Sequence, residues 1–196
     1  MSKDIKSVTV YASSSSQIDV SYFEAAKKLG ALFAKNNINC INGAGSKGLM
    51  GAVTDAALEN GGSVTGIIPK FMVDEGWCHT ELSECIVTTD IHKRKELMAS
   101  MSDACIALPG GIGTLEELLE IITWKQLGLY NNPIVILNIN GYYNDLLNML
   151  NRAAEEKFMH LRHTSIWSLA NTPDQALEIV LENSTWENNP LSIAAL

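Results

Sequence analysis

Short apolar runs alternate along this chain with longer stretches whose apolar residues recur at helical spacing. The runs are rich in β-branched residues and predict strands buried on both faces, at 7–12, 38–42, 63–68, 85–89, 104–109 and 134–138. Helical patterns fill the intervals, at Phe23, Ala26, Gly30 and Phe33 and over 48–60, 91–101, 114–128 and 142–157. This alternation implies right-handed βαβ crossovers. We therefore expect an α/β fold, a Rossmann-like doubly wound parallel sheet with helices on both faces.

The length of the chain is consistent with one domain. Its 196 residues are within the usual range of a single domain, and neither an internal repeat nor a linker divides them. A last helix is expected from Thr172 onward. We place one Rossmann-like domain over residues 1–185 and a C-terminal tail over residues 186–196.

Composition and charge exclude several classes of partner. The formal net charge is −8, so broad electrostatic binding to nucleic acid or to an anionic membrane is not expected. The N-terminus lacks the apolar core of a signal peptide, and no apolar run approaches the ~20 residues that span a bilayer. These features predict a cytoplasmic protein.

The four cysteines are expected to be unmodified thiols. Cys40 and Cys105 lie in strand-like runs and are predicted to be buried, whereas Cys78 and Cys85 lie between them along the chain. Their spacing matches neither a zinc motif nor a disulfide framework. We expect no metal and no disulfide.

A glycine-rich segment, GAGSKGLMGA, follows the predicted strand 38–42 and opens a helix. Gly43 and Gly45 would let a phosphate approach backbone N–H groups, and the helix N-terminus favours an anion. A tight turn without a ligand is the structural alternative. The dinucleotide fingerprint fits only as GAGSKG, and no acidic residue clearly ends the next strand, which weakens the interpretation as an NAD-dependent dehydrogenase.

A second loop of the same kind, LPGGIGTLEE, follows the predicted strand 104–109. Two such loops in a small domain favour a phosphorylated, nucleotide-like ligand. Thr114 and Glu117 also match the T-x-x-E capping box, in which Glu117 would bond to the backbone at the start of a helix. Capping and chemistry are therefore both possible roles for Glu117.

The segment DIHKRKELMASM concentrates basic residues where a helix disfavours them. Asp90 is a plausible N-cap, which puts Arg94 near the positive end of the helix dipole. Arg94 shares the apolar stripe of Leu97, Met98 and Met101 and should point inward, whereas Lys93 should face solvent. Such violations tend to mark functional sites, although a solvated basic turn is the alternative.

These motifs together resemble the Lonely Guy family of cytokinin-activating phosphoribohydrolases, whose members are often called lysine decarboxylases. The resemblance rests on HKRKELM followed by LPGGIGTLEELLEIITWKQLG, and extends over about residues 7 to 182. It implies hydrolysis of the N-glycosidic bond of AMP or an N6-modified AMP to the free base and ribose 5-phosphate. It also implies a homodimer and requires neither a cofactor nor a metal.

The resemblance assigns roles to individual residues. It implies that Arg94 and Glu117 are catalytic, with their separate roles left open, and that Glu75 contacts the substrate, although its alignment is less secure. The other residues implied to surround the nucleotide are Gly43, Gly45, Lys95, Gly110, Gly111, Ile112, Gly113, Thr114, Leu115, Glu116 and Thr123. Two positions depart from the family pattern, because Ser13 and Ala44 stand where glycine is common. A non-catalytic nucleotide or cofactor carrier is the competing hypothesis, and a dehydrogenase the third.

Overall fold

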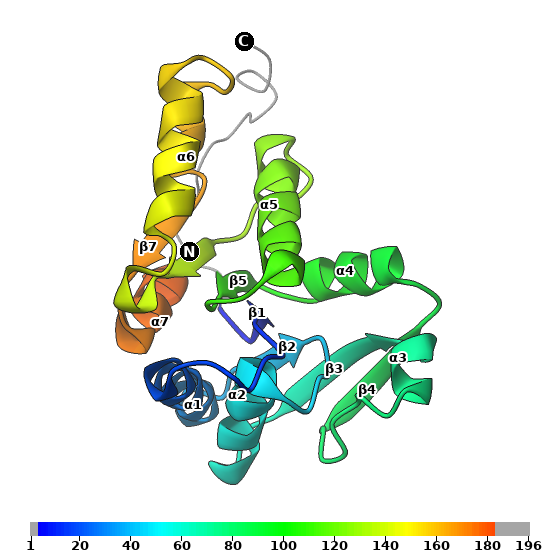
Figure 1. The fold of residues 1–196 in the computed structure, drawn as a ribbon. Helices are drawn as coiled ribbons and strands as arrows, with labels where there is room; N and C mark the ends of the chain where they lie inside the picture. Colours follow the sequence, from blue (N-terminus) through cyan, green and yellow to red (C-terminus); the bar gives the residue numbers. More distant parts are fainter. Residues whose placement is uncertain (1–3, 183–196) are drawn as a thin grey trace.

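A computed structural model describes residues 4–182 and shows one sheet of seven parallel strands in the order β4-β3-β2-β1-β5-β6-β7 (Figure 1). The strands are β1 (Ser7–Tyr11), β2 (Asn39–Asn42), β3 (Val64–Pro69), β4 (Glu84–Thr88), β5 (Ala104–Ala107), β6 (Ile134–Leu137) and β7 (Ser168–Ala170). The expected doubly wound α/β fold is confirmed. The predicted tail, 186–196, lies outside the described residues.

Helices connect successive strands. The α-helices are α1 (Val20–Lys35), α2 (Gly48–Glu59), α3 (Lys70–Asp74), α4 (Ile91–Ser100), α5 (Ile112–Gln126), α6 (Asn144–Glu155) and α7 (Pro173–Glu182). Short 3₁₀ helices occupy Ile139–Gly141 and Leu161–Ser165. Within residues 4–182, no helix combines the length and the apolar composition needed to cross a bilayer.

The sheet separates two hydrophobic cores. Alternate residues of β1 point to opposite faces, so Val8 and Val10 join the core beneath α1, α2 and α7, whereas Tyr11 joins the other core. That second core contains Met98 of α4 and Leu118 of α5. Figure 1 shows the same layers, with α1 and α2 on one side of the sheet and α4 and α5 on the other.

The structure differs from the sequence-based expectation at the ends of the sheet. β4 was expected to be buried, but it is an edge strand and most of its residues are exposed or half-buried. The other edge strand, β7, and the short helix α3 were not predicted. β7 has only three residues, Ser168–Ala170, which is too short to produce a recognisable alternation of apolar residues.

The sheet order places a topological switch point between β1 and β5. From this position the chain winds outward through β2, β3 and β4 on one side and through β6 and β7 on the other. The loops that leave β1 and β5 therefore diverge and open a crevice at the carboxyl ends of the strands. Ligands bind in this crevice in doubly wound folds.

Candidate active site

A cavity of about 810 Å³ lies at the carboxyl ends of the central strands. Its wall comes from the loops after β1, β2 and β5, from the end of β3 with the segment that follows it, and from α4 and α5. The lining residues are 12–15, Gly43, 45–47, Met50, Ile68, Met72, 75–77, Arg94, 111–114 and Glu117. The cavity thus occupies the crevice that the switch point creates.

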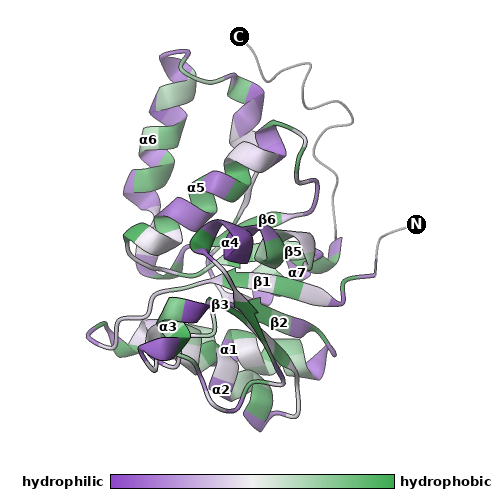
Figure 2. Ribbon diagram, turned by 90° about the vertical axis from the view of Figure 1, so that its right-hand side faces the viewer, coloured by the Kyte–Doolittle hydropathy of each residue, from purple (hydrophilic) through white to green (hydrophobic). Residues whose placement is uncertain are grey.

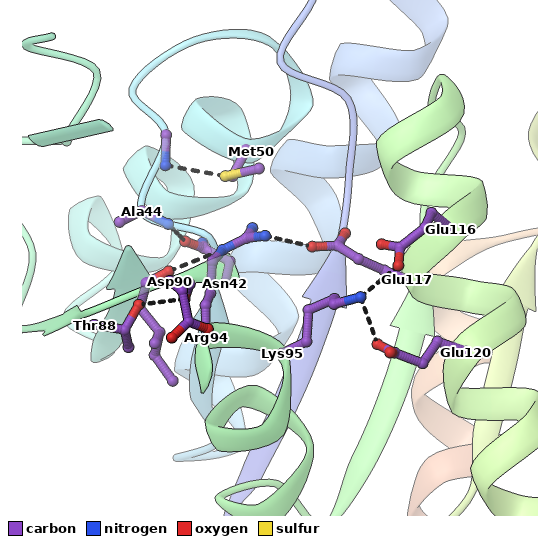
Figure 3. Close-up of polar contacts among 12 residues, drawn as sticks. Asn42, Ala44, Met50, Thr88, Asp90, Arg94, Lys95, Glu116, Glu117 and Glu120 are labelled. Carbon is purple, nitrogen blue, oxygen red and sulfur yellow. Dashed lines mark hydrogen bonds and ion pairs between the residues drawn. The ribbon is translucent and has the colours of Figure 1, made fainter. Parts of the chain in front are cut away.

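An ion pair between Arg94 and Glu117 lies in the wall of this cavity (Figure 3). Arg94 Nη1 donates to Glu117 Oε1 at 2.8 Å, and Arg94 Nε donates to the carbonyl oxygen of Ile67 at 3.1 Å. Both side chains are buried, at 10% and 8% exposure. The guanidinium therefore connects β3 to α5 and fixes one carboxylate oxygen of Glu117.

The local sequence of α4 explains the position of Arg94. The Asp90 carboxylate accepts a hydrogen bond from Lys93 N at 2.8 Å, so Asp90 is the N-cap that the sequence predicted. Arg94 then turns inward together with Met98, whereas Lys93 remains at the surface and pairs with Glu96. The prediction of an inward Arg94 and an outward Lys93 is confirmed.

The capping-box interpretation of Glu117 is wrong. Helix α5 begins at Ile112 with Gly111 as its N-cap, and no side chain caps it. Thr114 already lies inside the helix, so Glu117 is too far along the helix to bond to its start. Its carboxylate instead pairs with Arg94. Burial raises the pKa of Glu117 above the ordinary 4.5, although the nearby Arg94 guanidinium opposes this change.

Gly43 provides the space that Arg94 occupies. A Cβ atom at this position would overlap the Arg94 guanidinium. The backbone N–H groups that follow are already engaged within the protein: those of Ala44, Gly45 and Ser46 donate to Asn42 Oδ1, Met50 Sδ and the carbonyl oxygen of Trp77. This glycine loop therefore shapes the cavity wall rather than offering three free donors.

The start of α2 is also occupied. The N–H groups of Leu49 and Met50 both donate to the carbonyl oxygen of Ser13, at 2.9 and 3.2 Å. Ser13, which stands where the resembled family commonly has glycine, thus binds this helix terminus through its backbone. Ala44, the other departure, adopts a positive φ of 61°.

The start of α5 has backbone donors available for a ligand. Ile112, Gly113 and Thr114 form its first turn, where N–H groups have no partner within the helix, and no other acceptor in residues 4–182 contacts them. The Thr114 hydroxyl is likewise without a hydrogen bond among the described residues. All three residues line the cavity. An anion fits at this position by both hydrogen bonding and the helix dipole.

Two tyrosines that sequence reasoning did not single out hold the loop before α5. Tyr142 Oη donates to the carbonyl oxygen of Gly110, and Tyr143 Oη donates to that of Leu108, each at 2.6 Å. These bonds satisfy the carbonyl side of the loop. They thereby fix the loop that leads into the N-terminus of α5.

Comparison with known proteins identifies the family. A family model described as possible lysine decarboxylase matches residues 50–180. Over 154 residues the chain is 46% identical to cytokinin riboside 5'-monophosphate phosphoribohydrolase LOG1 of Arabidopsis thaliana, with 79% of this chain and 72% of that protein covered. The probable phosphoribohydrolase LOGL6 of Oryza sativa subsp. japonica is 44% identical over 171 residues, which is 87% of this chain and 68% of that protein. The chain belongs to this Lonely Guy family.

Solved structures extend the likeness in fold. The molybdenum cofactor carrier protein of Chlamydomonas reinhardtii superposes with a TM-score of 0.70 at 19% identity, covering 91% of this chain and 98% of the carrier. At such low identity the similarity concerns the fold alone. It does not favour the carrier hypothesis over the phosphoribohydrolase family.

The cavity gathers most of the residues that the family resemblance implied. Its wall contains nine of them: Gly43, Gly45, Glu75, Arg94, Gly111, Ile112, Gly113, Thr114 and Glu117. Five others are not part of the wall: Lys95, Gly110, Leu115, Glu116 and Thr123. Gly110 affects the wall indirectly, because a Cβ atom at this position would overlap the Thr114 side chain. Whether any of these residues contacts substrate remains a prediction.

Lys95 and Glu116 belong to a second charged cluster beside the cavity (Figure 3). Lys95 is almost fully buried and pairs with Glu116 and with Glu120, the latter at 3.0 Å. Burial alone would lower the pKa of Lys95, but its hydrogen bonds to the two carboxylates raise it above the ordinary value. This cluster joins α4 to α5 and so holds the two elements that carry Arg94 and Glu117. Thr123, further along α5, donates to the Leu119 carbonyl oxygen.

An apolar part of the wall was missed at the level of sequence. Ile68 at the end of β3, Met72 of α3 and Trp77 line the cavity. Trp77 is 54% exposed, whereas tryptophan is highly buried on average in folded proteins. The general rule that sites follow the carboxyl ends of strands could have directed attention to this segment, because it follows β3 directly.

Proposed function

We propose that the protein hydrolyses the N-glycosidic bond of AMP or an N6-modified AMP, releasing the base and ribose 5-phosphate. The observation that carries this proposal is the position of the Arg94–Glu117 pair beside the open N-terminus of α5, in one cavity. The Glu117 carboxylate of the pair suits a sugar that becomes cationic, and the N-terminus of α5 suits a phosphate. The named activity of relatives at 44% and 46% identity supports the same reaction.

The phosphate is expected at the start of α5. The N–H groups of Ile112, Gly113 and Thr114 and the Thr114 hydroxyl converge there, and the helix dipole adds partial positive charge. The first glycine loop is less suited because its donors are already bonded within the protein. The 5'-phosphate therefore orients the nucleotide, and a nucleoside without it should be a poor substrate.

Glu117 is expected to act on the ribose. Cleavage of the bond between the ribose C1' and the purine nitrogen builds positive charge on the sugar, which a nearby carboxylate stabilises. Arg94 fixes Oε1, and the second oxygen of the carboxylate has no hydrogen-bond donor among the described residues. That oxygen can face the sugar or accept a proton from the attacking water. Arg94 keeps the carboxylate in place and balances its charge.

The apolar wall is expected to receive the base. Ile68, Met72 and Trp77 supply flat or flexible apolar surface, and aromatic rings stack well on purines. An N6-substituent that is itself apolar would extend this contact. The preference between AMP and its N6-modified forms therefore depends on this wall.

Incubation with matched nucleotides tests the function. AMP, N6-isopentenyl-AMP and adenosine are supplied at equal concentration, and the free base is measured by chromatography. The proposal predicts release of base from at least one of the two monophosphates and turnover of adenosine lower by at least about 10²-fold, because the helix donors lose their anionic partner. Equal turnover of AMP and adenosine would contradict the assigned phosphate site. Tight binding of nucleotides without any turnover would instead favour the carrier hypothesis.

We further propose that the protein is a cytoplasmic homodimer, as the family resemblance implies. Helix α6 has only one buried residue, Ala154, although its sequence is strongly amphipathic. Large apolar side chains are exposed on α6 and just after the ends of α5 and α6; they are Met149, Leu127, Leu129 and Phe158. Figure 2 shows both helices extending away from the sheet on the same side. Exposed apolar surface of this kind is typical of a protein–protein contact.

A further inference from the structure

Two cysteines far from the core lie in contact beside the cavity wall. The Sγ atoms of Cys78 and Cys85 are 3.6 Å apart, and both residues are free thiols. Cys85 is exposed and Cys78 is half-buried. Sequence spacing provides no reason to pair them, because seven positions separate them in no recognised motif.

The backbone holds both thiols in this position. Cys78 forms an antiparallel bridge with Gly45, and the neighbouring hydrogen bonds run from Ser46 N to the Trp77 carbonyl at 3.1 Å and from His79 N to the Ala44 carbonyl at 2.8 Å. Cys85 lies on β4 and pairs in register with Gly66 of β3. The contact is therefore a product of the fold rather than of a flexible chain end.

The space around Gly66 explains how this contact is possible. A Cβ atom on Gly66 would overlap the side chains of Leu82 and Ala44. Residues paired across parallel strands point to the same face, so the Cys85 side chain is directed to the face on which Ala44 and its glycine loop lie. Cys78 is bonded to the same loop through Gly45.

We propose that Cys78 and Cys85 form a reversible disulfide under oxidising conditions, which ties the cavity wall at residues 75–77 to the edge strand β4. The cross-link rests on the contacts of the two thiols alone, whereas its expected effect on KM also rests on the proposed enzymatic function. The sulfur atoms need to approach from 3.6 Å to a bond length of about 2 Å, which is within the reach of small side-chain rotations.

The reaction balances with a hydroperoxide as the oxidant. The exposed Cys85 thiol attacks the peroxide and becomes a sulfenic acid, while the peroxide is reduced to water or, for an alkyl hydroperoxide, to an alcohol. The Cys78 sulfur then displaces hydroxide from the sulfenic sulfur, and its own proton leaves with that hydroxide as water. Burial and the neighbouring Cys85 thiol raise the pKa of Cys78 to about 11, so Cys78 stays protonated near neutral pH and the exposed Cys85 is the thiol that meets the oxidant first. The second step depends on the 3.6 Å contact between the two sulfur atoms and should become faster as pH rises.

The two remaining cysteines serve as internal controls. Cys40 and Cys105 are fully buried in the hydrophobic cores. Burial raises the pKa of both thiols, that of Cys40 to about 12. They should resist an oxidant that converts the exposed pair.

A disulfide at this position would restrain one side of the cavity. Glu75 and Trp77 line the cavity and precede Cys78 directly, whereas Arg94 and Glu117 lie on α4 and α5. The bond would thus limit the movement of the apolar wall without touching the ion pair. Its effect on catalysis should appear in KM more than in kcat.

The test is a count and a map of thiols in the full chain. The reduced protein is treated with hydrogen peroxide, quenched and unfolded, and its thiols are titrated. The proposal predicts a decrease from four thiols to two, the loss of the mass of two hydrogen atoms, and a cross-linked peptide that contains Cys78 and Cys85. Dithiothreitol should restore all four. Cys78→Ser and Cys85→Ser should each abolish the cross-link, whereas Cys40→Ala should retain it.

Thermal unfolding tests the restraint itself. The oxidised wild-type protein should unfold at a temperature roughly 5 °C higher than the reduced protein, and the double variant with serine at both positions should show no such difference. A mixed disulfide at Cys85, a cross-link between chains or an unchanged thiol count would overturn the proposal. A cross-link without any change in unfolding temperature or in KM would contradict the restraint of the wall.

Discussion

Arg94 carries a positive charge near the N-terminus of α4, where the helix dipole opposes it, and it is buried there. The Glu117 carboxylate and the Ile67 carbonyl oxygen compensate for this position. Removing one partner of a buried ion pair destabilises the folded protein strongly, because the other charge is left buried without a counter-charge. The Arg94–Glu117 pair lies beside an open cavity, which is consistent with a role in binding or catalysis.

Gly43→Ala is expected to damage the site without changing any polar group. The added methyl overlaps the Arg94 guanidinium, which must move away from Glu117. Because Arg94 holds the Glu117 carboxylate in place, moving its guanidinium should lower turnover by roughly 10²-fold. Steady-state release of base measures the effect, and Ala44→Gly in the same loop is the control because glycine tolerates the positive φ at that position. Wild-type turnover in folded Gly43→Ala would contradict the role assigned to this clearance.

The pH dependence of turnover should report Glu117. Burial, opposed in part by Arg94, raises its pKa above the ordinary 4.5, and the carboxylate is the form that stabilises a cationic sugar. kcat/KM should therefore increase as pH rises through a limb whose midpoint lies above 4.5. In Glu117→Gln this limb should disappear from the residual activity. A midpoint below the ordinary value would contradict a raised pKa at Glu117.

At the scale of elements, the sequence predicted the central strands and most helices because these elements are buried regularly. β1, β5 and β6 are short apolar runs covered on both faces, so their pattern follows directly from their burial. β4 was misjudged because an apolar composition does not distinguish an edge from a central position. α3 was missed because five residues are too few to show helical periodicity.

The candidate site was predictable as a set of residues but not as a set of contacts. Arg94 and the loop before α5 were found from a violated dipole rule and from glycines after a strand. The capping box failed because the N-cap of α5 is Gly111, three residues before Thr114, and the first turn of the helix includes Gly113. The occupied donors of the first glycine loop depend on Asn42, Met50 and Trp77, which only the tertiary structure brings there.

Lys125 fixes the C-terminal end of α5, and the pH dependence of stability tests this role. It is buried, donates to the Asn132 carbonyl oxygen, and burial lowers its pKa to about 8 from the ordinary 10.5. The unfolded chain therefore binds a proton that the folded protein releases between these values, so stability should increase with pH across this interval. Relative to Lys125→Met, the wild-type unfolding free energy should gain roughly 3 kcal/mol from about pH 7.5 to 10.5. Denaturant titrations of both proteins measure it, and a difference that stays flat or falls would contradict the lowered pKa.

At the scale of the whole molecule, the strand order determines where the cavity lies. The two hydrophobic cores hold the helices against the two faces of the sheet. The α1, α2 and α7 side packs extensively, whereas α6 on the other side remains largely exposed. This asymmetry leaves one face of the molecule suited to a second copy of the chain. This face lies on the same side of the sheet as α5, whose N-terminus lines the cavity.

Met149→Glu combined with Phe158→Glu should convert the proposed dimer to a monomer. Both side chains are exposed in the single chain, at 62% and 79%, so the change should leave its fold intact while placing charges in an apolar contact. Sedimentation velocity at micromolar concentration measures the mass. Lys27→Glu, at an exposed position of α1 on the other side of the sheet, is the control and should remain dimeric. A monomeric wild-type protein, or a double variant that still forms dimers, would refute this interface.

The turnover of Glu117→Gln tests the central claim most directly. Glutamine retains the size of the side chain and can still accept the hydrogen bond from Arg94, but it cannot stabilise a cationic sugar or accept a proton. With N6-isopentenyl-AMP or AMP as substrate, we expect base release to fall by roughly 10²- to 10⁴-fold, with circular dichroism unchanged. Because Arg94 loses its buried counter-charge, stability should fall by up to about 3–5 kcal/mol, so turnover is compared at a temperature at which the variant is fully folded. A folded Glu117→Gln protein that releases base at the wild-type rate would contradict a catalytic role for this carboxylate.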